Sequence, residues 1–104
     1  MQKTIFITGA SAGLGKATAK LFQSRGWDVI ATMRNPEQET ELKQLENITL
    51  LPLDVTDPEQ IKTTTAKAIS LYPIDVVFNN AGYGLMGAME ALHFQLKKSI
   101  SAIV

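Results

Sequence analysis

A glycine-rich turn near the start of the chain carries the clearest chemical signal. It occupies residues 8–15, reads TGASAGLG, and lies between an apolar run and a helical pattern. Glycine tolerates backbone angles that other residues avoid, and it lets a ligand approach the main chain closely. The N-terminus of the following helix would present N–H groups and a partial positive charge to a phosphate. The turn therefore predicts a phosphate-binding site, although a tight strand-to-helix turn without a ligand has the same pattern.

The spacing of the glycines separates this turn from two other phosphate-binding loops. Gly9, Gly13 and Gly15 give G-x-x-x-G-x-G rather than G-x-G-x-x-G. A Walker A loop is excluded as well, because Lys16 is followed by Ala17 where that loop needs Ser or Thr.

Such a turn needs a strand before it and a helix after it, and the chain alternates between the two. Short runs rich in β-branched residues predict buried strands at 4–7, 28–32, 48–53 and 74–78. Apolar spacing and capping residues predict helices from about 14 to Gly26, at 37–45, from 56–60 to about 71, and from 88 onward. This alternation indicates an α/β fold with a parallel sheet and right-handed crossovers.

Two further motifs follow the third and fourth predicted strands. Asp54-Val55 follows the third, and Asn-Asn-Ala-Gly at 79–82 follows the fourth. Together with T-G-x-x-x-G-x-G at residues 8–15, they resemble the short-chain dehydrogenase/reductase family over about residues 3–90. The resemblance implies a Rossmann-like parallel sheet with flanking helices, truncated to about four strands in the order 3-2-1-4, and a nicotinamide dinucleotide cofactor. The cofactor-binding residues that it implies are Thr8, Gly9, Ser11, Gly13, Leu14, Gly15, Arg34, Asp54, Val55, Asn80, Ala81 and Gly82.

The choice between NAD and NADP is made near the end of the second predicted strand. An acidic residue there would bind the 2′-hydroxyl of NAD and repel the 2′-phosphate of NADP. The family places that acidic residue at the position of Met33, which is neutral, and the next residue is Arg34. A guanidinium can form a charge-assisted fork with the 2′-phosphate, so we expect NADP rather than NAD. Arg34 could also be a solvated loop residue, and Ala12 stands where some NADP-preferring members have a second basic residue.

The polar residues of the other two motifs each have two interpretations. Asp54 could accept a hydrogen bond from the adenine amino group, with Val55 beside it, or it could cap the turn before Thr56; both can hold. The segment 80–82 resembles the family segment that packs beside the adenosine ribose and steadies the sheet. The two asparagines are also common turn formers.

The catalytic residues of the family are not found in the 104 residues. Members use a serine and a Tyr-x-x-x-Lys pair, but the residues four positions after Tyr72 and Tyr83 are Val76 and Gly87. We therefore expect residues 1–104 to form the N-terminal, NAD(P)-binding half of a Rossmann domain, without the C-terminal catalytic half. Two hypotheses stay open. One is the cofactor half, inactive alone, of an NADP(H)-dependent oxidoreductase for carbonyl or alcohol compounds; the other is a non-catalytic nucleotide-binding or self-associating half-domain.

The composition excludes other classes of protein. Ten basic and ten acidic residues give a net charge of zero, which argues against a nucleic-acid partner. The absence of cysteine excludes disulfides, thiolate catalysis and cysteine-ligated metals, and His93 alone cannot form a His-rich metal cluster. No signal peptide and no apolar run of about 20 residues is present, so we expect a cytoplasmic protein without a membrane partner.

Two features at the C-terminal end predict self-association. No fifth strand is expected, so the strand at 74–78 would leave an edge that recruits another strand. The last predicted helix adds an apolar stripe of Leu92, Leu96, Ile100, Ile103 and Val104. We expect a homo-oligomer, and a two-fold dimer is the favoured form because closed symmetry covers both surfaces at once. The alternative is a monomer in which the last helix folds back over the fourth strand.

Overall fold

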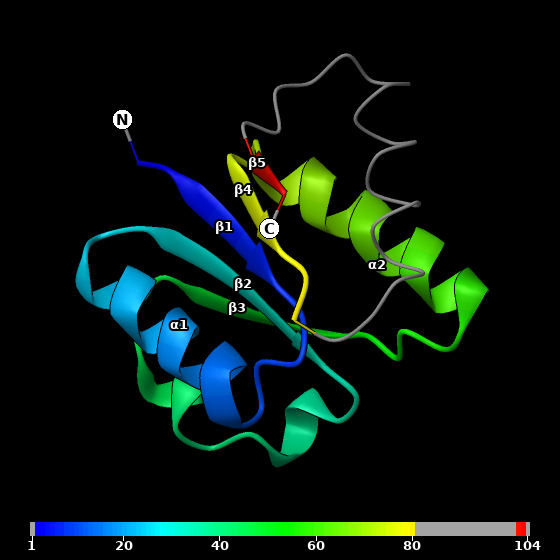
Figure 1. Ribbon diagram of the computed structural model, residues 1–104, viewed down its shortest axis with the longest axis horizontal. Coiled ribbons are helices and arrows are strands. Elements are labelled where there is room, and N and C mark those ends of the chain that lie inside the picture. Colours follow the sequence, from blue (N-terminus) through cyan, green and yellow to red (C-terminus); the bar gives the residue numbers. More distant parts are fainter. Residues whose placement is uncertain (1, 81–101, 104) are drawn as a thin grey trace.

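The computed structural model describes residues 2–80 and 102–103 of the chain. Strands alternate with helices or turns along the described residues, as Figure 1 shows. In chain order the elements are β1 (Thr4–Ile7), α1 (Gly13–Ser24), β2 (Asp28–Met33), η1 (Pro36–Gln38), η2 (Leu42–Gln44), β3 (Ile48–Pro52), α2 (Pro58–Leu71), β4 (Val76–Phe78) and β5 (Ala102–Ile103). The four strands predicted from the sequence are confirmed, with boundaries that differ by at most two residues.

The strands form one parallel sheet in the order β3-β2-β1-β4-β5. β1 pairs with β2 on one side and with β4 on the other, and every pairing is parallel. The predicted order 3-2-1-4 is therefore confirmed. The chain moves outward from β1 to β3 and then returns to the other side of β1. The carboxyl ends of β1 and β4 consequently flank the point where the winding direction reverses, which is the usual position of a ligand in such sheets.

The fifth strand corrects one expectation. Ala102 pairs with Val76 and Ile103 with Val77, so the outer edge of β4 is paired at these positions rather than open. The prediction that the chain supplies no fifth strand was wrong, and Ile103 belongs to a strand rather than to a helical stripe. A short apolar run fits the helical and the strand period equally well, so periodicity alone could not decide. The other residues of the predicted stripe lie outside the described residues.

Buried side chains on both faces of the sheet hold the helices in place. Phe6 points to the face that α2 covers, while its neighbours Ile5 and Ile7 point to the face of α1, as the alternation along a strand requires. On the α2 side Phe6 packs with Ile30, Leu51, Leu53, Ile61, Ala68, Ile74 and Val77. On the α1 side Ile5 and Ile7 pack with Ala10, Ala19, Val29, Ala31, Met33 and Leu42. This double-sided burial makes β1 the rigid centre from which the glycine turn departs.

The predicted ends of the two long helices are confirmed. Asp57 caps α2, since its carboxylate accepts from the N–H groups of Glu59 at 3.1 Å and Gln60 at 3.3 Å. Pro58 opens the helix, where its missing N–H costs no hydrogen bond. Gly26 follows α1 with a φ of 84°, the left-handed conformation that ends helices. No helix in the described residues is long and apolar enough to cross a membrane.

The segment after β2 differs from the prediction. The expected helix at 37–45 is instead two 3₁₀ turns, η1 and η2, and that expectation was wrong. Between them Glu39 is extended, with φ −79° and ψ 127°, and its carboxylate accepts from the backbone N–H of Leu42 at 3.0 Å. A carboxylate that caps a second turn interrupts any continuous helix, because the backbone bonds to the side chain instead.

Candidate cofactor-binding site

The three glycines of the turn are needed for two different physical reasons. Gly9 and Gly13 have φ values of 64° and 58°, which glycine adopts without strain. Gly15 lies in α1, and glycine is required there because the backbone of Gly9 lies too close to leave room for a side chain. A Cβ on Gly15 would lie 2.2 Å from the carbonyl oxygen of Gly9 and 3.0 Å from Nδ2 of Asn80. Gly15 thus lets the start of α1 lie directly on the turn that follows β1.

The N-terminus of α1 is open to an anionic ligand. Ala12 is the N-cap, its backbone is extended, and in the described part of the chain no side chain caps the helix. The first turn of α1 contains no acidic residue. The N–H groups of this turn and the helix dipole therefore favour a phosphate or another anion here.

Asn80 ties the end of β4 to the glycine turn. Its backbone N–H donates to Oγ1 of Thr8 at 2.9 Å, and its side-chain Nδ2 donates to the carbonyl oxygen of Gly9 at 3.4 Å. The N–H of Thr8 in turn donates to the carbonyl oxygen of Phe78 at 3.1 Å. The predicted residues Thr8, Gly9, Gly15 and Asn80 are thereby brought together, and Asn80 positions the turn. Ala81 and Gly82 lie outside the described residues.

A cleft of about 580 Å³ lies beside this turn at the carboxyl ends of β1, β2 and β3. Four predicted residues line it, namely Gly9, Ser11, Arg34 and Val55. The other lining residues are Lys16, Met33, Asn35, Gln38, Glu39, Thr40 and Leu53. The predicted residues Thr8, Gly13, Leu14, Gly15, Asp54 and Asn80 are outside this lining; the first four belong to the turn and the start of α1, where Leu14 is exposed.

Arg34 and Asp54 face each other at the ends of β2 and β3. Nε of Arg34 lies 3.9 Å from Oδ1 of Asp54, and the arginine side chain is 68% exposed. The same Oδ1 accepts from the hydroxyl of Thr56 at 2.6 Å and from its backbone N–H at 2.9 Å. These two hydrogen bonds lower the pKa of Asp54, and the charge of Arg34 adds to the effect. The turn-capping interpretation of Asp54 is confirmed.

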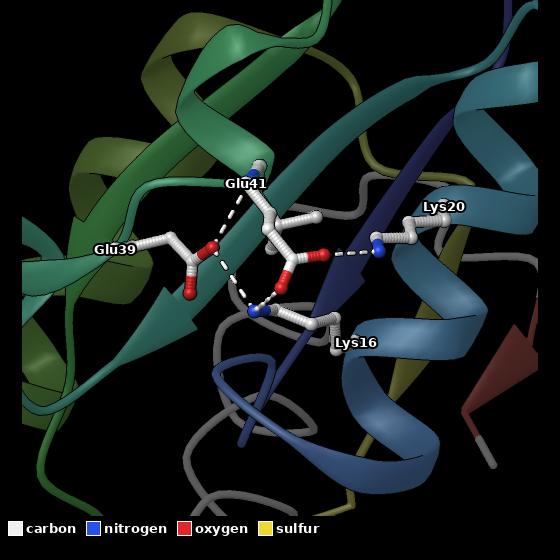
Figure 2. Close-up of polar contacts among 5 residues, drawn as sticks. Lys16, Lys20, Glu39 and Glu41 are labelled. Carbon is white, nitrogen blue, oxygen red and sulfur yellow. Dashed lines mark hydrogen bonds and ion pairs between the residues drawn. The ribbon is translucent and has the colours of Figure 1, made fainter.

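Lys16 and Glu39, which line the cleft, belong to a cluster of four charged side chains that was not predicted from the sequence. Lys16 and Lys20 project from α1 toward Glu39 and Glu41 of the segment between η1 and η2, as Figure 2 shows. Nζ of Lys16 lies 3.2 Å from Glu39 and 3.3 Å from Glu41, while Lys20 pairs with Glu41. The available signal was a lysine directly after Gly15 and a run of carboxylates after β2, but the two are far apart in sequence.

Mutual pairing favours the charged forms of Lys16, Glu39 and Glu41. Burial disfavours the charged form of Lys16, but hydrogen bonds to Glu39 and Glu41 outweigh it and raise its pKa. Burial likewise opposes the charge of Glu39, which is 6% exposed, but the Leu42 N–H and Lys16 lower its pKa overall. Lys20 and then Lys16 lower the pKa of Glu41. The cluster thus ties the segment after β2 to α1 and holds Lys16 and Glu39 in place at the cleft.

A family model described as short chain dehydrogenase matches residues 3–103. The chain belongs to this family. An uncharacterized oxidoreductase of Schizosaccharomyces pombe is 39% identical over 93 residues, which are 88% of this chain and 31% of that protein. The chain spans about a third of the length of the curated relatives that it matches.

Solved structures of the family share the fold. A short-chain dehydrogenase/reductase of Burkholderia multivorans with bound NADP is 40% identical, with a TM-score of 0.68 over 79% of this chain and 37% of that one. ElxO with NADP bound is 26% identical, with a TM-score of 0.82 over 99% of this chain and 54% of that one. The Rossmann-like fold of the chain is therefore that of family members that bind a nicotinamide dinucleotide.

Proposed function

We propose that residues 1–104 are the dinucleotide-binding part of an NADP(H)-dependent oxidoreductase that acts on a carbonyl or alcohol compound. The observation that carries the proposal is the cleft beside the glycine turn. It lies between the N-terminus of α1, which no side chain of residues 2–80 caps, Gly9 with its left-handed backbone, and the cationic side chain of Arg34. The NADP-bound family structures support the same ligand class.

The described residues fit a dinucleotide. The N–H groups at the start of α1 would hold the pyrophosphate, because they are directed along the helix axis and no side chain of the described residues caps them. Gly9 and Gly13 would leave the space for its close approach, while Gly15 lets the start of α1 lie on the turn. Val55 and Leu53 would form an apolar wall for the adenine. When bound, the nicotinamide ring would supply or accept the hydride, and the role of this chain is to hold and orient the cofactor.

Preference for NADP rests on the residues that end β2. Met33 is neutral and 3% exposed, so it offers no carboxylate to the 2′-hydroxyl of NAD. Arg34 is exposed at the cleft and shares only a 3.9 Å contact with Asp54, so its guanidinium can turn toward a 2′-phosphate. A charge-assisted hydrogen bond of this kind contributes about 1.5–3 kcal/mol, and the lower end applies to an exposed side chain.

Binding titrations of the two reduced cofactors test this proposal. We expect NADPH to bind the chain about tenfold more tightly than NADH, and Arg34→Ala to remove most of that difference. Arg25→Ala is the matched control, because Arg25 is exposed at the other end of α1. Equal dissociation constants for NADPH and NADH would overturn the proposed preference, and failure to bind either would overturn the proposed site.

A non-catalytic role is the second candidate, and one observation favours it. Tyr72 packs against the apolar cluster on the α2 side of the sheet rather than lining the cleft. Neither it nor Tyr83 begins a Tyr-x-x-x-Lys pair. We therefore propose that the 104 residues bind a cofactor without catalysing its reaction. We also propose, on separate grounds from the sequence, that the protein is cytoplasmic and forms a homo-oligomer.

A further inference from the structure

Lys16 brings a second positive charge to the cleft in addition to Arg34. The two side chains come from different elements, Lys16 from the first turn of α1 and Arg34 from the segment after β2, yet both line the same cavity. Glu39 is the carboxylate that lines it with them. The lining itself therefore carries two cations and one carboxylate, and the further carboxylates Glu41 and Asp54 contact these cations from outside the lining.

The two carboxylates that pair with Lys16 are held to different degrees. Glu39 has a side chain that is 4% exposed and is fixed by the N–H of Leu42, so it cannot leave Lys16 easily. Glu41 has a side chain that is 58% exposed and shares its charge with Lys20. Figure 2 shows Glu41 between the two lysines. Glu41 can therefore release Lys16 and keep Lys20 as its partner.

We propose that Lys16 is a second specificity-determining cation for the 2′-phosphate of NADP, and that Glu41 competes with this phosphate for it. The inference rests on the proposed function, since it assumes that the adenosine end of the cofactor occupies the cleft. A lysine ammonium has three N–H donors, so it can keep Glu39 and bind a phosphate oxygen when Glu41 turns to Lys20. The side chain of Lys16 is 20% exposed, so solvent screens this contact less than it screens Arg34.

The geometry also explains how a basic residue at this position can replace the one that Ala12 does not provide. Lys16 N–H donates to the carbonyl oxygen of Ala12 at 3.3 Å, so the lysine lies one helical turn beyond Ala12 at the start of α1. Its long side chain spans the remaining distance to the wall of the cleft. Glu39 is the positioning residue that holds the ammonium there.

Calorimetric titration of the chain with 2′,5′-ADP and with 5′-ADP isolates the 2′-phosphate. Lys16→Met should weaken 2′,5′-ADP by about three- to tenfold, the scale of one partly exposed charge-assisted hydrogen bond, and leave 5′-ADP within about twofold. Glu41→Gln should strengthen 2′,5′-ADP by about two- to threefold, because Lys16 loses a competing partner. This gain should disappear when Glu41→Gln is combined with Lys16→Met. Lys67→Met, an exposed lysine on α2, is the matched control for net charge.

The possible outcomes separate the inference from the proposed function. If Lys16→Met weakens both nucleotides equally, Lys16 only pins the segment after β2 and the inference is overturned. If Arg34→Ala lowers the preference for 2′,5′-ADP and Lys16→Met does not, the proposed function stands without it. If the unaltered chain binds the two nucleotides equally, the NADP preference itself fails, and this inference fails with it. Glu41→Gln lies on the surface, so its result does not depend on whether Lys16→Met folds.

Discussion

Gly15 approaches the backbone of Gly9 so closely that any Cβ on Gly15 would lie 2.2 Å from the Gly9 carbonyl oxygen. That oxygen belongs to the main chain and also accepts from Nδ2 of Asn80, so it cannot move without disturbing the end of β4. The contact joins the first helix, the glycine turn and the fourth strand at one point. Loss of this close approach would separate the helix N-terminus from the turn that it completes.

We expect Gly15→Ala to lower the free energy of unfolding by about 1–3 kcal/mol, the usual cost of forcing an extra methyl group into a packed site. Binding of NADPH should be lost as well, because the start of α1 moves. Gly13→Ala is the comparison. In the described residues nothing lies within 4 Å of a Cβ on Gly13, so that variant suffers only the strain of a positive φ, about 1–2 kcal/mol.

Thermal unfolding followed by circular dichroism and titration with NADPH measure both effects. The decisive measurement is NADPH binding by Gly15→Ala, and Gly13→Ala serves as the comparison for stability, because its Cβ would meet no neighbour in the described residues. If Gly15→Ala bound NADPH as tightly as the unaltered chain, the contact with Gly9 would not control the geometry of the site.

The free energy of unfolding should decrease at acidic pH because Glu39 becomes protonated. Burial raises the pKa of its carboxyl, but the Leu42 N–H and Lys16 outweigh burial and bring the pKa below the ordinary value of 4.5. A carboxyl whose pKa is lower in the folded state stabilises the fold above its unfolded pKa. This stabilisation is lost as the pH falls from about 5 through the lowered folded value.

Denaturant titrations between neutral pH and about pH 3 test this expectation, and Glu39→Gln should flatten the acid slope. Glutamine keeps an oxygen for the N–H of Leu42 but carries no charge for Lys16. Glu37→Gln is the matched control, because Glu37 is exposed on the preceding turn. An identical acid slope in Glu39→Gln and the unaltered chain would show that another group carries the pH dependence.

The sequence predicted those features that local chemistry determines. The alternation of apolar runs predicted the parallel sheet, and the cap at Asp57 with Pro58 predicted the start of α2. The strand order came from the resemblance of three motifs to the family rather than from the apolar pattern. The segment after β2 could not be predicted. The charged pattern favoured one helix, but the carboxylate of Glu39 accepts from the N–H of Leu42, so the chain forms two short turns, η1 and η2, instead. The pairing of Lys16 with Glu41 spans 25 positions and exists only after the sheet has brought α1 and β2 together.

The prediction of a homo-oligomer stays open after the correction at β5. The pairing of β5 covers Val76 and Val77 of β4, so an open edge at these two residues no longer supports association. Leu14 and Leu21 on α1 and Leu71 on α2 are exposed by 65%, 51% and 46%, and a chain of zero net charge has little repulsion to oppose contact. We expect a dimer by light scattering coupled to size exclusion at several concentrations. A monomeric mass at every concentration would contradict it.

Catalysis should be absent from the 104 residues by themselves. A positioned proton donor or acceptor typically increases the rate of such reactions by about 10²–10⁴-fold. Tyr72 cannot take this role at the cleft, because it packs against the apolar cluster on the α2 side of the sheet. The chain should therefore bind NADPH without accelerating its oxidation by simple aldehydes and ketones above the rate in buffer. Loss of NADPH absorbance measures this rate, and Gly15→Ala, which should not bind the cofactor, is the matched control. A carbonyl-dependent rate that exceeds the buffer rate and disappears in Gly15→Ala would contradict the prediction and require a proton donor within these residues.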